Sequence, residues 1–207
     1  MKNFSFKVEE LIDKYIKKDS LVLDVGCGTG IHTSILKQKT KRITGLDLKN
    51  FVKEKYKSGF KLILGDGKKI PFKDKHFDFI TCWDVIEHVE KDEVFLREIY
   101  RVLKPGGLLL ISTPNKDRLS NRIISIFKEI RYPYYLGTNL DWEGDVWHIR
   151  EYREEELEKL ATKIGFEVVM KEGIYLGFYG FVRLGIYKVP KILHGLTQHI
   201  FMVLSKK

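Results

Sequence analysis

Three aspartates, Asp24, Asp47 and Asp66, stand close to the ends of three successive apolar runs. In a parallel sheet such strand ends meet at one edge, so we expect the three carboxylates to line one crevice. At such an edge Asp47 can accept hydrogen bonds from both hydroxyls of a ribose. Asp66 can accept one from an exocyclic amine, and the neighbouring N–H of Gly67 can donate to a ring nitrogen. These positions predict one ligand site built from separate strands.

A glycine-rich loop begins at the first of these aspartates. Its sequence is Asp24-Val25-Gly26-Cys27-Gly28-Thr29-Gly30. The three glycines let the backbone turn sharply and let a ligand approach it closely. Ile31 takes the place of the third glycine of the dinucleotide fingerprint, and no Lys-Ser or Lys-Thr pair follows as in a P-loop. Because a carboxylate before the loop would repel phosphate, the loop favours a ligand that carries an ammonium or sulfonium group.

Apolar runs alternate with amphipathic segments along most of the chain. The predicted strands cover residues 21–25, 42–47, 61–66, 77–84, 108–113, 166–173 and 199–207. The predicted helices cover residues 4–18, 30–38, 51–56, 91–103, 120–130 and 153–166. Continuous apolar strands that alternate with helices are typical of an α/β fold with a mostly parallel sheet covered on both faces. We expect a single domain over residues 1–207 with two insertions, at 114–150 and 174–195, and a loop over 132–148.

Composition excludes several classes of protein. The 207 residues include 37 Lys and Arg and 28 Asp and Glu, and the formal net charge of +9 favours anionic partners. The two cysteines, Cys27 and Cys82, are too few for a disulfide scaffold. Their apolar surroundings predict reduced thiols and a cytoplasmic protein. We expect neither a signal peptide nor a membrane-spanning segment, because no apolar run reaches the roughly 18 residues that a span needs.

Five segments resemble class I S-adenosylmethionine-dependent methyltransferases in their order and spacing, over about residues 10–115. They are LDVGCGTG, GLD, GDGKKIPF, FDFITCWDVIEHV and LKPGGLLLISTPN. The resemblance implies a Rossmann-like α/β fold with a seven-stranded sheet of order 3-2-1-4-5-7-6, in which the last strand is antiparallel. The chain is also similar to the ubiquinone-biosynthesis O-methyltransferases, which share the IEHV and TPN segments and an insertion after the fifth strand.

The same resemblance implies S-adenosylmethionine as the cofactor and assigns ten residues to it. Those expected around the methionine moiety are Asp24, Gly26, Cys27, Gly28 and Gly30. Those expected at the ribose are Asp47 and Leu48, and those expected at the adenine are Asp66 and Gly67. Trp83, just after the fourth predicted strand, is expected to lie against the cofactor.

Two histidines are candidates for the chemistry. Methyl transfer from a sulfonium is an in-line displacement with a neutral leaving group, so alignment supplies much of the rate. A general base helps when the acceptor is a hydroxyl or a thiol. His88 lies in DVIEHV after the fourth predicted strand, and His148 lies in HIREY within the insertion. We predict both as catalytic residues, with a structural hydrogen bond as the alternative role of each.

A divalent metal is a further hypothesis. Asp84, Glu87 and His88 are spaced i, i+3 and i+4, so on a helix they would share one face, and His148 could join them. Carboxylates and imidazoles suit a divalent metal. The pattern resembles the Glu-x-x-Glu-His…His site of small-RNA 2′-O-methyltransferases, with Asp84 in place of the first glutamate. Because aspartate is one methylene shorter, the sequence favours a site without metal and names these four residues as the ligands if one binds.

The two insertions should shape the acceptor pocket. Loops at the carboxyl ends of the strands face the ligand, so 114–150 and 174–195 are expected to form a lid on the acceptor side. Both segments are rich in apolar and aromatic residues. This composition favours a small lipophilic or aromatic acceptor, methylated at oxygen, and a peripheral membrane contact through 174–195.

Two other functions stay open. Basic residues among aromatics also suit single-stranded nucleic acid, so metal-assisted RNA 2′-O-methylation is one alternative. Nucleic acid is the weaker partner because arginine is scarce and no RNA-binding module is recognisable in the chain. The other alternative is a non-catalytic, cofactor-binding regulatory protein, which would keep the glycine loop and block the acceptor pocket.

Overall fold

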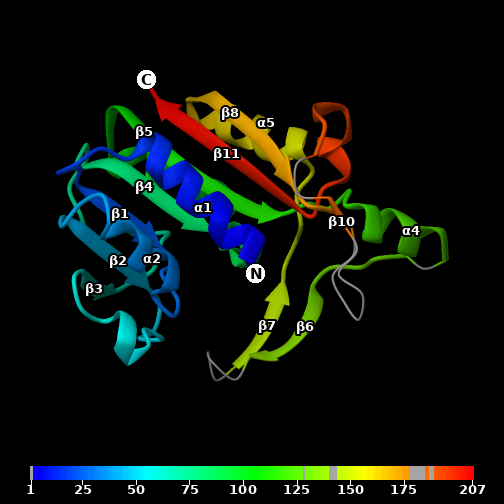
Figure 1. The fold of residues 1–207 in the computed structure, drawn as a ribbon, viewed down its shortest axis with the longest axis horizontal. Coiled ribbons are helices and arrows are strands. Elements are labelled where there is room, and N and C mark those ends of the chain that lie inside the picture. Colours follow the sequence, from blue (N-terminus) through cyan, green and yellow to red (C-terminus); the bar gives the residue numbers. More distant parts are fainter. Residues whose placement is uncertain (1, 128, 140–143, 178–184, 187–188) are drawn as a thin grey trace.

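A seven-stranded sheet forms the centre of the protein (Figure 1). The computed structural model describes residues 2–127, 129–139, 144–177, 185–186 and 189–207. The strands of this sheet are β1 (Val22–Val25), β2 (Ile43–Asp47), β3 (Lys61–Leu64), β4 (Phe77–Trp83), β5 (Leu103–Pro114), β8 (Phe166–Ile174) and β11 (His199–Lys206).

The strand order is β3-β2-β1-β4-β5-β11-β8. β11 runs antiparallel to both of its neighbours, β5 and β8. The pairs among β1 to β5 are parallel. Because β8 and β11 are the sixth and seventh strands of this sheet, the expected order and the antiparallel last strand are confirmed. The parallel half places the carboxyl ends of β1 to β4 at one edge, where ligands bind in such folds.

Helices cover both faces of the sheet. The core around α1 (Lys2–Tyr15) and α2 (Ile31–Leu36) lies on one face, and the core around α3 (Asp92–Val102) and α5 (Glu154–Ile164) lies on the other. Side chains alternate along a strand, so β1 contributes to the cores on both faces of the sheet. Val22 packs in the first core, whereas Leu23 and Val25 pack in the second.

α3 turns one apolar face toward the sheet. Phe95 on that face is buried, whereas the neighbouring Val94 is 43% exposed. Phe95, Ile99 and Val102 recur at i, i+4 and i+7, which is the spacing of one helical face. Val94 therefore falls at the edge of the apolar stripe.

The first insertion contains a helix and a hairpin. α4 (Leu119–Phe127) precedes β6 (Tyr134–Asn139), which pairs antiparallel with β7 (Gly144–His148). The predicted loop over 132–148 is therefore wrong. Aromatic and β-branched residues favour strands, and here that preference outweighs the glycines that suggested a loop. The hairpin projects away from the seven-stranded sheet (Figure 1).

The second insertion is described only in part. It contains β9 (Leu176–Gly177), which pairs with β10 (Gly185–Ile186), and a 3₁₀ helix, η3 (Lys191–Leu196). Residues 178–184 and 187–188, which include most of the basic and aromatic residues of 174–195, lie outside the described residues. Two shorter 3₁₀ turns are η1 (Glu54–Tyr56), where a helix over 51–56 was expected, and η2 (Ile86–His88). Within the described part of the chain, no helix combines the length and apolarity that a bilayer crossing requires.

Candidate active site

A pocket of about 750 Å³ opens where β1, β2, β3 and β4 end. This is the crevice expected at the carboxyl ends of the strands, and its volume is that of a small-molecule site. The predicted cofactor residues that line it are Gly26, Cys27, Gly28, Asp47, Leu48, Asp66, Gly67 and Trp83. Asp24 and Gly30 do not line it.

The glycine loop makes the floor of the pocket. Gly26 and Gly28 adopt left-handed backbone conformations with φ of 71° and 50°, respectively. A Cβ on Gly26 would lie 2.3 Å from Cγ2 of Val85, so only glycine fits there. Gly30, with φ of 82°, caps the start of α2, and a Cβ there would meet Val52 instead of the pocket. Gly30 thus shapes the loop without bordering the cavity.

Asp47 joins the loop to the end of β2. The backbone N–H of Gly28 donates to Oδ2 of Asp47 over 2.8 Å. Leu48, the next residue, is 70% exposed and borders the same pocket. The carboxylate therefore stands at the strand end where a ribose can be bound, and one of its oxygens already holds the loop.

Asp66 and Gly67 border the pocket just beyond β3. The N–H of Lys68 donates to Oδ1 of Asp66 over 2.8 Å, and the Lys68 ammonium lies 3.5 Å from Oδ2. A Cβ on Gly67 would lie 2.5 Å from Cε2 of Phe95, so the backbone here packs directly on α3. This side of the pocket offers a carboxylate next to a bare backbone segment.

Asp24 occupies a different place from the one expected. On β1 it points with Val22 toward α2, and its carboxylate accepts hydrogen bonds from the hydroxyls of Thr33 and Thr81. The side chain is 1% exposed. Burial raises the pKa of Asp24 to about 6, although the two threonine hydroxyls act against this shift. Side chains alternate between the two faces of a strand, so the Asp24 carboxylate points to the face of the sheet covered by α2. It therefore does not reach the crevice at the end of the strand.

Trp83 and Cys27 border the pocket with largely buried side chains. The indole Nε1 of Trp83 is buried without a hydrogen-bond partner among the described residues. Burial raises the pKa of the Cys27 thiol, and the nearby carboxylates of Asp24 and Asp47 raise it further. Cys27 is therefore a neutral thiol and not a nucleophile. Cys82 is also free and buried.

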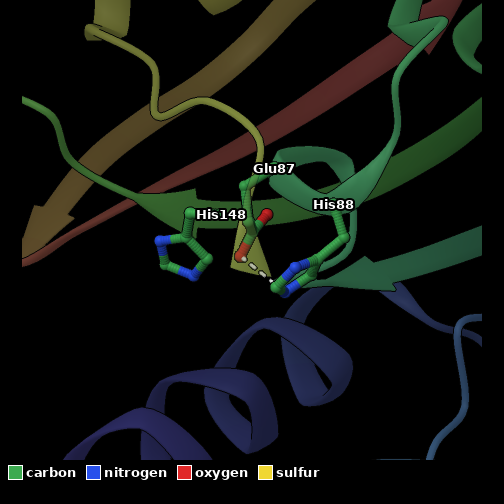
Figure 2. Close-up of side chains that lie close together, drawn as sticks. All are labelled: Glu87, His88 and His148. Atoms are coloured by element: carbon green, nitrogen blue, oxygen red, sulfur yellow. Dashed lines mark ion pairs between the residues drawn. The ribbon is translucent and has the colours of Figure 1, made fainter. Parts of the chain in front are cut away.

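Glu87, His88 and His148 form a cluster next to this pocket. Glu87 and His88 belong to η2, and His148 ends β7. One ligand atom from each side chain lies within 4.8 Å of the other two (Figure 2). The N–H of Ile149 donates to the carbonyl oxygen of Glu87 over 2.9 Å and so joins the end of the hairpin to η2. The structure thus brings together the two histidines that were predicted as catalytic.

His88 connects the cluster with the pocket, since it lines the cavity while Glu87 and His148 are buried behind it. Nδ1 of His88 lies 2.7 Å from the carbonyl oxygen of Trp147, so that nitrogen carries the proton. Burial lowers the pKa of His88 and raises the pKa of Glu87 well above its usual value. At neutral pH His88 is therefore neutral, with a lone pair on Nε2.

Asp84 does not join this cluster. Its backbone is left-handed, with φ of 51°, and η2 begins two residues later, so the expected common helical face does not form. Oδ1 of Asp84 accepts a hydrogen bond from Ser112 over 2.7 Å, and Oδ2 lies 3.4 Å from Nε2 of His199. Like His88, Asp84 lines the pocket.

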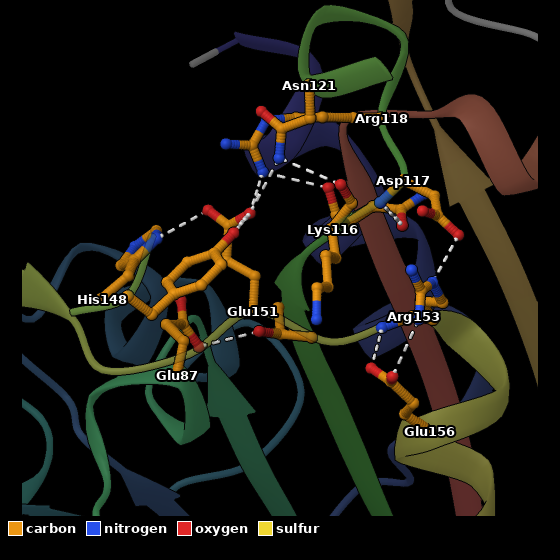
Figure 3. A network of polar contacts seen from close by, with 12 residues as sticks. Glu87, Lys116, Asp117, Arg118, Asn121, His148, Glu151, Arg153 and Glu156 are labelled. Atoms are coloured by element: carbon orange, nitrogen blue, oxygen red, sulfur yellow. Dashed lines mark hydrogen bonds and ion pairs between the residues drawn. The ribbon is translucent and has the colours of Figure 1, made fainter. Parts of the chain in front are cut away.

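Glu151 fixes the orientation of His148. Nδ1 of His148 donates to Oε1 of Glu151 over 2.9 Å. Oε2 accepts hydrogen bonds from Arg118, Asn121 and Tyr132 (Figure 3). Burial would raise the pKa of Glu151, but these partners lower it to about 2. Glu151 was not among the residues predicted from the sequence, although a carboxylate three positions after a predicted catalytic histidine was a signal that could have found it.

Comparison with known proteins places the chain in a family. A family model described as a methyltransferase domain matches residues 4–171. The chain belongs to this family. The domain is 28% identical over 159 residues to a probable S-adenosylmethionine-dependent methyltransferase of Mycolicibacterium smegmatis, over 75% of this chain and 55% of that protein. It is 33% identical over 132 residues to demethylmenaquinone methyltransferase of Staphylococcus aureus, over 59% of this chain and 53% of that protein.

The methyltransferase domain spans about half the length of these curated relatives. A crystal structure from Thermotoga maritima, described as an S-adenosylmethionine-dependent methyltransferase and possible histamine N-methyltransferase, has a TM-score of 0.67. The two sequences are 21% identical, and the match covers 100% of this chain and 90% of the Thermotoga maritima chain. This likeness concerns the fold. Together with the family match, it confirms the resemblance to class I methyltransferases.

Proposed function

We propose that this methyltransferase domain transfers the methyl group of S-adenosylmethionine to an oxygen of a small lipophilic acceptor. The observation that carries the proposal is the single pocket in which Asp47, Asp66 and the glycine loop meet His88. One region of that pocket has the polar groups that a nucleoside needs. The other has the side chain that a hydroxyl acceptor needs.

In this proposal the strand ends bind the cofactor. Asp47 accepts the ribose hydroxyls, and Asp66 with Gly67 pairs with the adenine edge. The methionine moiety lies along the loop at Gly26 and Gly28, whose left-handed backbone favours glycine and leaves the chain bare for close approach. Asp24 supports this loop from the core through Thr33 and does not touch the cofactor in this proposal.

The transfer itself is one displacement. The acceptor oxygen attacks the methyl carbon, the S–CH₃ bond breaks as the O–CH₃ bond forms, and the electron pair stays on the sulfur of S-adenosylhomocysteine. The hydroxyl proton passes to Nε2 of His88, whose neutral state and fixed tautomer suit a general base. His148 packs edge-on against the His88 ring from behind, with its own ring held by Glu151.

Apolar side chains around the same pocket indicate the chemical class of the acceptor. Those that line it include Phe4, Ile31, Leu48, Val85, Val89 and Ile149. Such a lining favours a lipophilic molecule over a charged one. The Staphylococcus aureus relative is named for demethylmenaquinone, a lipophilic quinone-like substrate, which agrees with this class. Residues 114–150 and 174–195 act as the acceptor-side lid in this proposal, and 174–195 as its membrane contact.

The experiment uses methyl-labelled S-adenosylmethionine with an extract of the source cells, separated afterwards into lipid, small-molecule, RNA and protein fractions. We expect the label in the lipid or small-molecule fraction. The Asp47→Ala variant is the control for cofactor-dependent transfer, and Asp13→Ala, at a surface ion pair with Lys39, is the matched control. Label in RNA would replace this proposal with RNA 2′-O-methylation. Bound cofactor without label in any fraction would replace it with a regulatory, non-catalytic protein.

A further inference from the structure

We infer that Glu87, His88 and His148 form a binding site for one first-row divalent metal ion. Their ligand atoms lie within 4.8 Å of one another and come from two separate elements, η2 and β7. Two imidazoles and one carboxylate form a ligand set that zinc, iron, cobalt and manganese accept in proteins. The sequence alone favoured a metal-free site, and the geometry reverses that preference.

Glu87 carries a buried carboxylate oxygen that has no hydrogen-bond partner among the described residues. Glu87 is fully buried, and Thr113 donates to its Oε2 over 2.9 Å. Oε1 is buried too and has no hydrogen-bond partner in the described part of the chain. A buried oxygen without a partner is costly, and the loss is greater for a carboxylate. A cation between Glu87 and the two histidines would remove this cost.

The two imidazoles are held in orientations that suit metal binding. Nδ1 of His88 donates to the carbonyl oxygen of Trp147, and Nδ1 of His148 donates to Glu151. Each Nε2 is therefore left with a lone pair. Metal-binding histidines commonly donate their other N–H to a carbonyl or carboxylate in this way. Both supporting contacts are already present here, so the site is built before any ion binds.

A simple ion pair explains these positions less well. Nε2 of His88 lies 4.0 Å from Oε1 of Glu87, which is beyond hydrogen-bond range. A histidine that served only to neutralise Glu87 would turn its N–H toward that oxygen. Instead, its N–H faces Trp147. Coordination at about 2.0–2.1 Å would draw the ligand atoms roughly an ångström closer together.

Glu151 then becomes a positioning residue for the metal site. It contacts His148 and not the pocket, and three other donors hold its second oxygen. Asn121 of α4 and Arg118, which directly precedes this helix, both contact Glu151, so the first insertion is structurally tied to the cluster (Figure 3). Removal of such a supporting partner typically weakens metal affinity about 10–100-fold.

The role of the ion rests on the proposed function, although the site itself does not. When bound, the ion supplies a Lewis acid that makes a nearby hydroxyl more acidic. His88 and His148 would then serve as ligands instead of proton acceptors, and the hydroxyl proton would leave to water at the pocket mouth. Because His88 lines the pocket, the site has access to the acceptor side.

The test is metal binding by the full chain. Chelator-treated protein is titrated with Zn²⁺ by calorimetry and with Co²⁺ by visible absorption, and bound metal is counted after gel filtration. We expect one ion per chain, with a Co²⁺ spectrum typical of nitrogen and oxygen ligands. Glu87→Gln, which keeps the shape and the Thr113 contact, and His148→Ala should each weaken binding at least tenfold, and Glu151→Gln about 10–100-fold. His76→Gln, from a histidine outside the cluster, should change nothing.

Binding of S-adenosylhomocysteine by each variant shows that it is folded. The inference is overturned if the wild type binds no stoichiometric metal, or if Glu87→Gln and His148→Ala bind it as tightly as the wild type. Methyl transfer at the full rate by chelator-treated protein would overturn the catalytic role of the ion and leave His88 as the base. Metal binding in a protein that binds no S-adenosylmethionine would instead contradict the proposed function and leave the metal site standing.

Discussion

The N–H of Gly28 donates to the Oδ2 of Asp47 over 2.8 Å, and this bond links the glycine loop to the end of β2. One carboxylate thus holds the loop in place and borders the pocket. Removal of the Asp47 side chain should therefore both loosen the glycine loop and weaken ligand binding at the pocket.

Asp47→Ala should weaken S-adenosylmethionine binding by roughly 10–100-fold, because it removes charge-assisted hydrogen bonds of about 1.5–3 kcal/mol. Equilibrium dialysis with labelled cofactor measures this directly. Asp13→Ala removes a surface carboxylate paired with Lys39 and should leave the dissociation constant unchanged. Equal binding by Asp47→Ala and wild type would remove Asp47 from the cofactor site.

Gly26→Ala should lose cofactor binding by more than tenfold. The new Cβ would lie 2.3 Å from Cγ2 of Val85 in the wall of the pocket. Gly106→Ala is the matched control, because its φ of 73° is almost that of Gly26 but no atom lies within 4 Å of its Cβ position. Both variants carry the same backbone strain, so calorimetric titration with S-adenosylhomocysteine isolates the crowding. Similar losses in the two variants would assign the effect to strain.

Asp24→Asn should change the pH dependence of stability. Burial raises the pKa of Asp24 to about 6, from 3.8 for the ordinary side chain. A raised folded-state pKa gives stability that is complete below about pH 4 and is lost as the pH rises through about 6. The shift corresponds to about 3 kcal/mol. Urea unfolding of both proteins between pH 4 and 8 should therefore show the wild type losing stability relative to Asp24→Asn. A constant difference across this range would mean that Asp24 ionises normally.

His88→Ala should lower the turnover number by about 10²–10⁴-fold and leave cofactor affinity within about twofold. His88 lines the pocket, and in the proposed function it faces the acceptor while the strand ends hold the cofactor. Rates with a labelled acceptor and dialysis with labelled cofactor separate the two effects. His76→Ala, at a histidine stacked on Phe72, is the control. Unchanged turnover would exclude His88 as the general base.

The sheet and most of the residues that line the pocket could be predicted from the sequence because their signals are local. A buried apolar run and a glycine loop each fix their own backbone, and Asp47 and Gly67 stand beside such runs. Asp24 was misplaced because its direction depends on the alternation of β1 relative to α2, which is a tertiary fact. Asp84 was misplaced because i, i+3 and i+4 spacing has meaning only on a helix, and η2 is a single 3₁₀ turn.

The cluster at Glu87 was predictable only in part. The sequence identified His88 and His148 separately, but their meeting depends on a hairpin that was expected to be a loop. The backbone bond from Ile149 to Glu87 closes that connection and has no signature in the sequence. Glu151 was missed for the same reason, since its partners come from α4 and from the segment before β6.

Methyl transfer itself is tested most directly by product stoichiometry. Purified protein is incubated with methyl-labelled S-adenosylmethionine and the lipid fraction of the source cells, and S-adenosylhomocysteine and labelled lipid are counted in the same sample. We predict one S-adenosylhomocysteine for each methyl group that enters an organic-soluble product as a methyl ether, and neither product with Asp47→Ala. Cofactor bound at the pocket with no S-adenosylhomocysteine formed, whichever cell fraction is supplied, would contradict methyl transfer as the function of this domain.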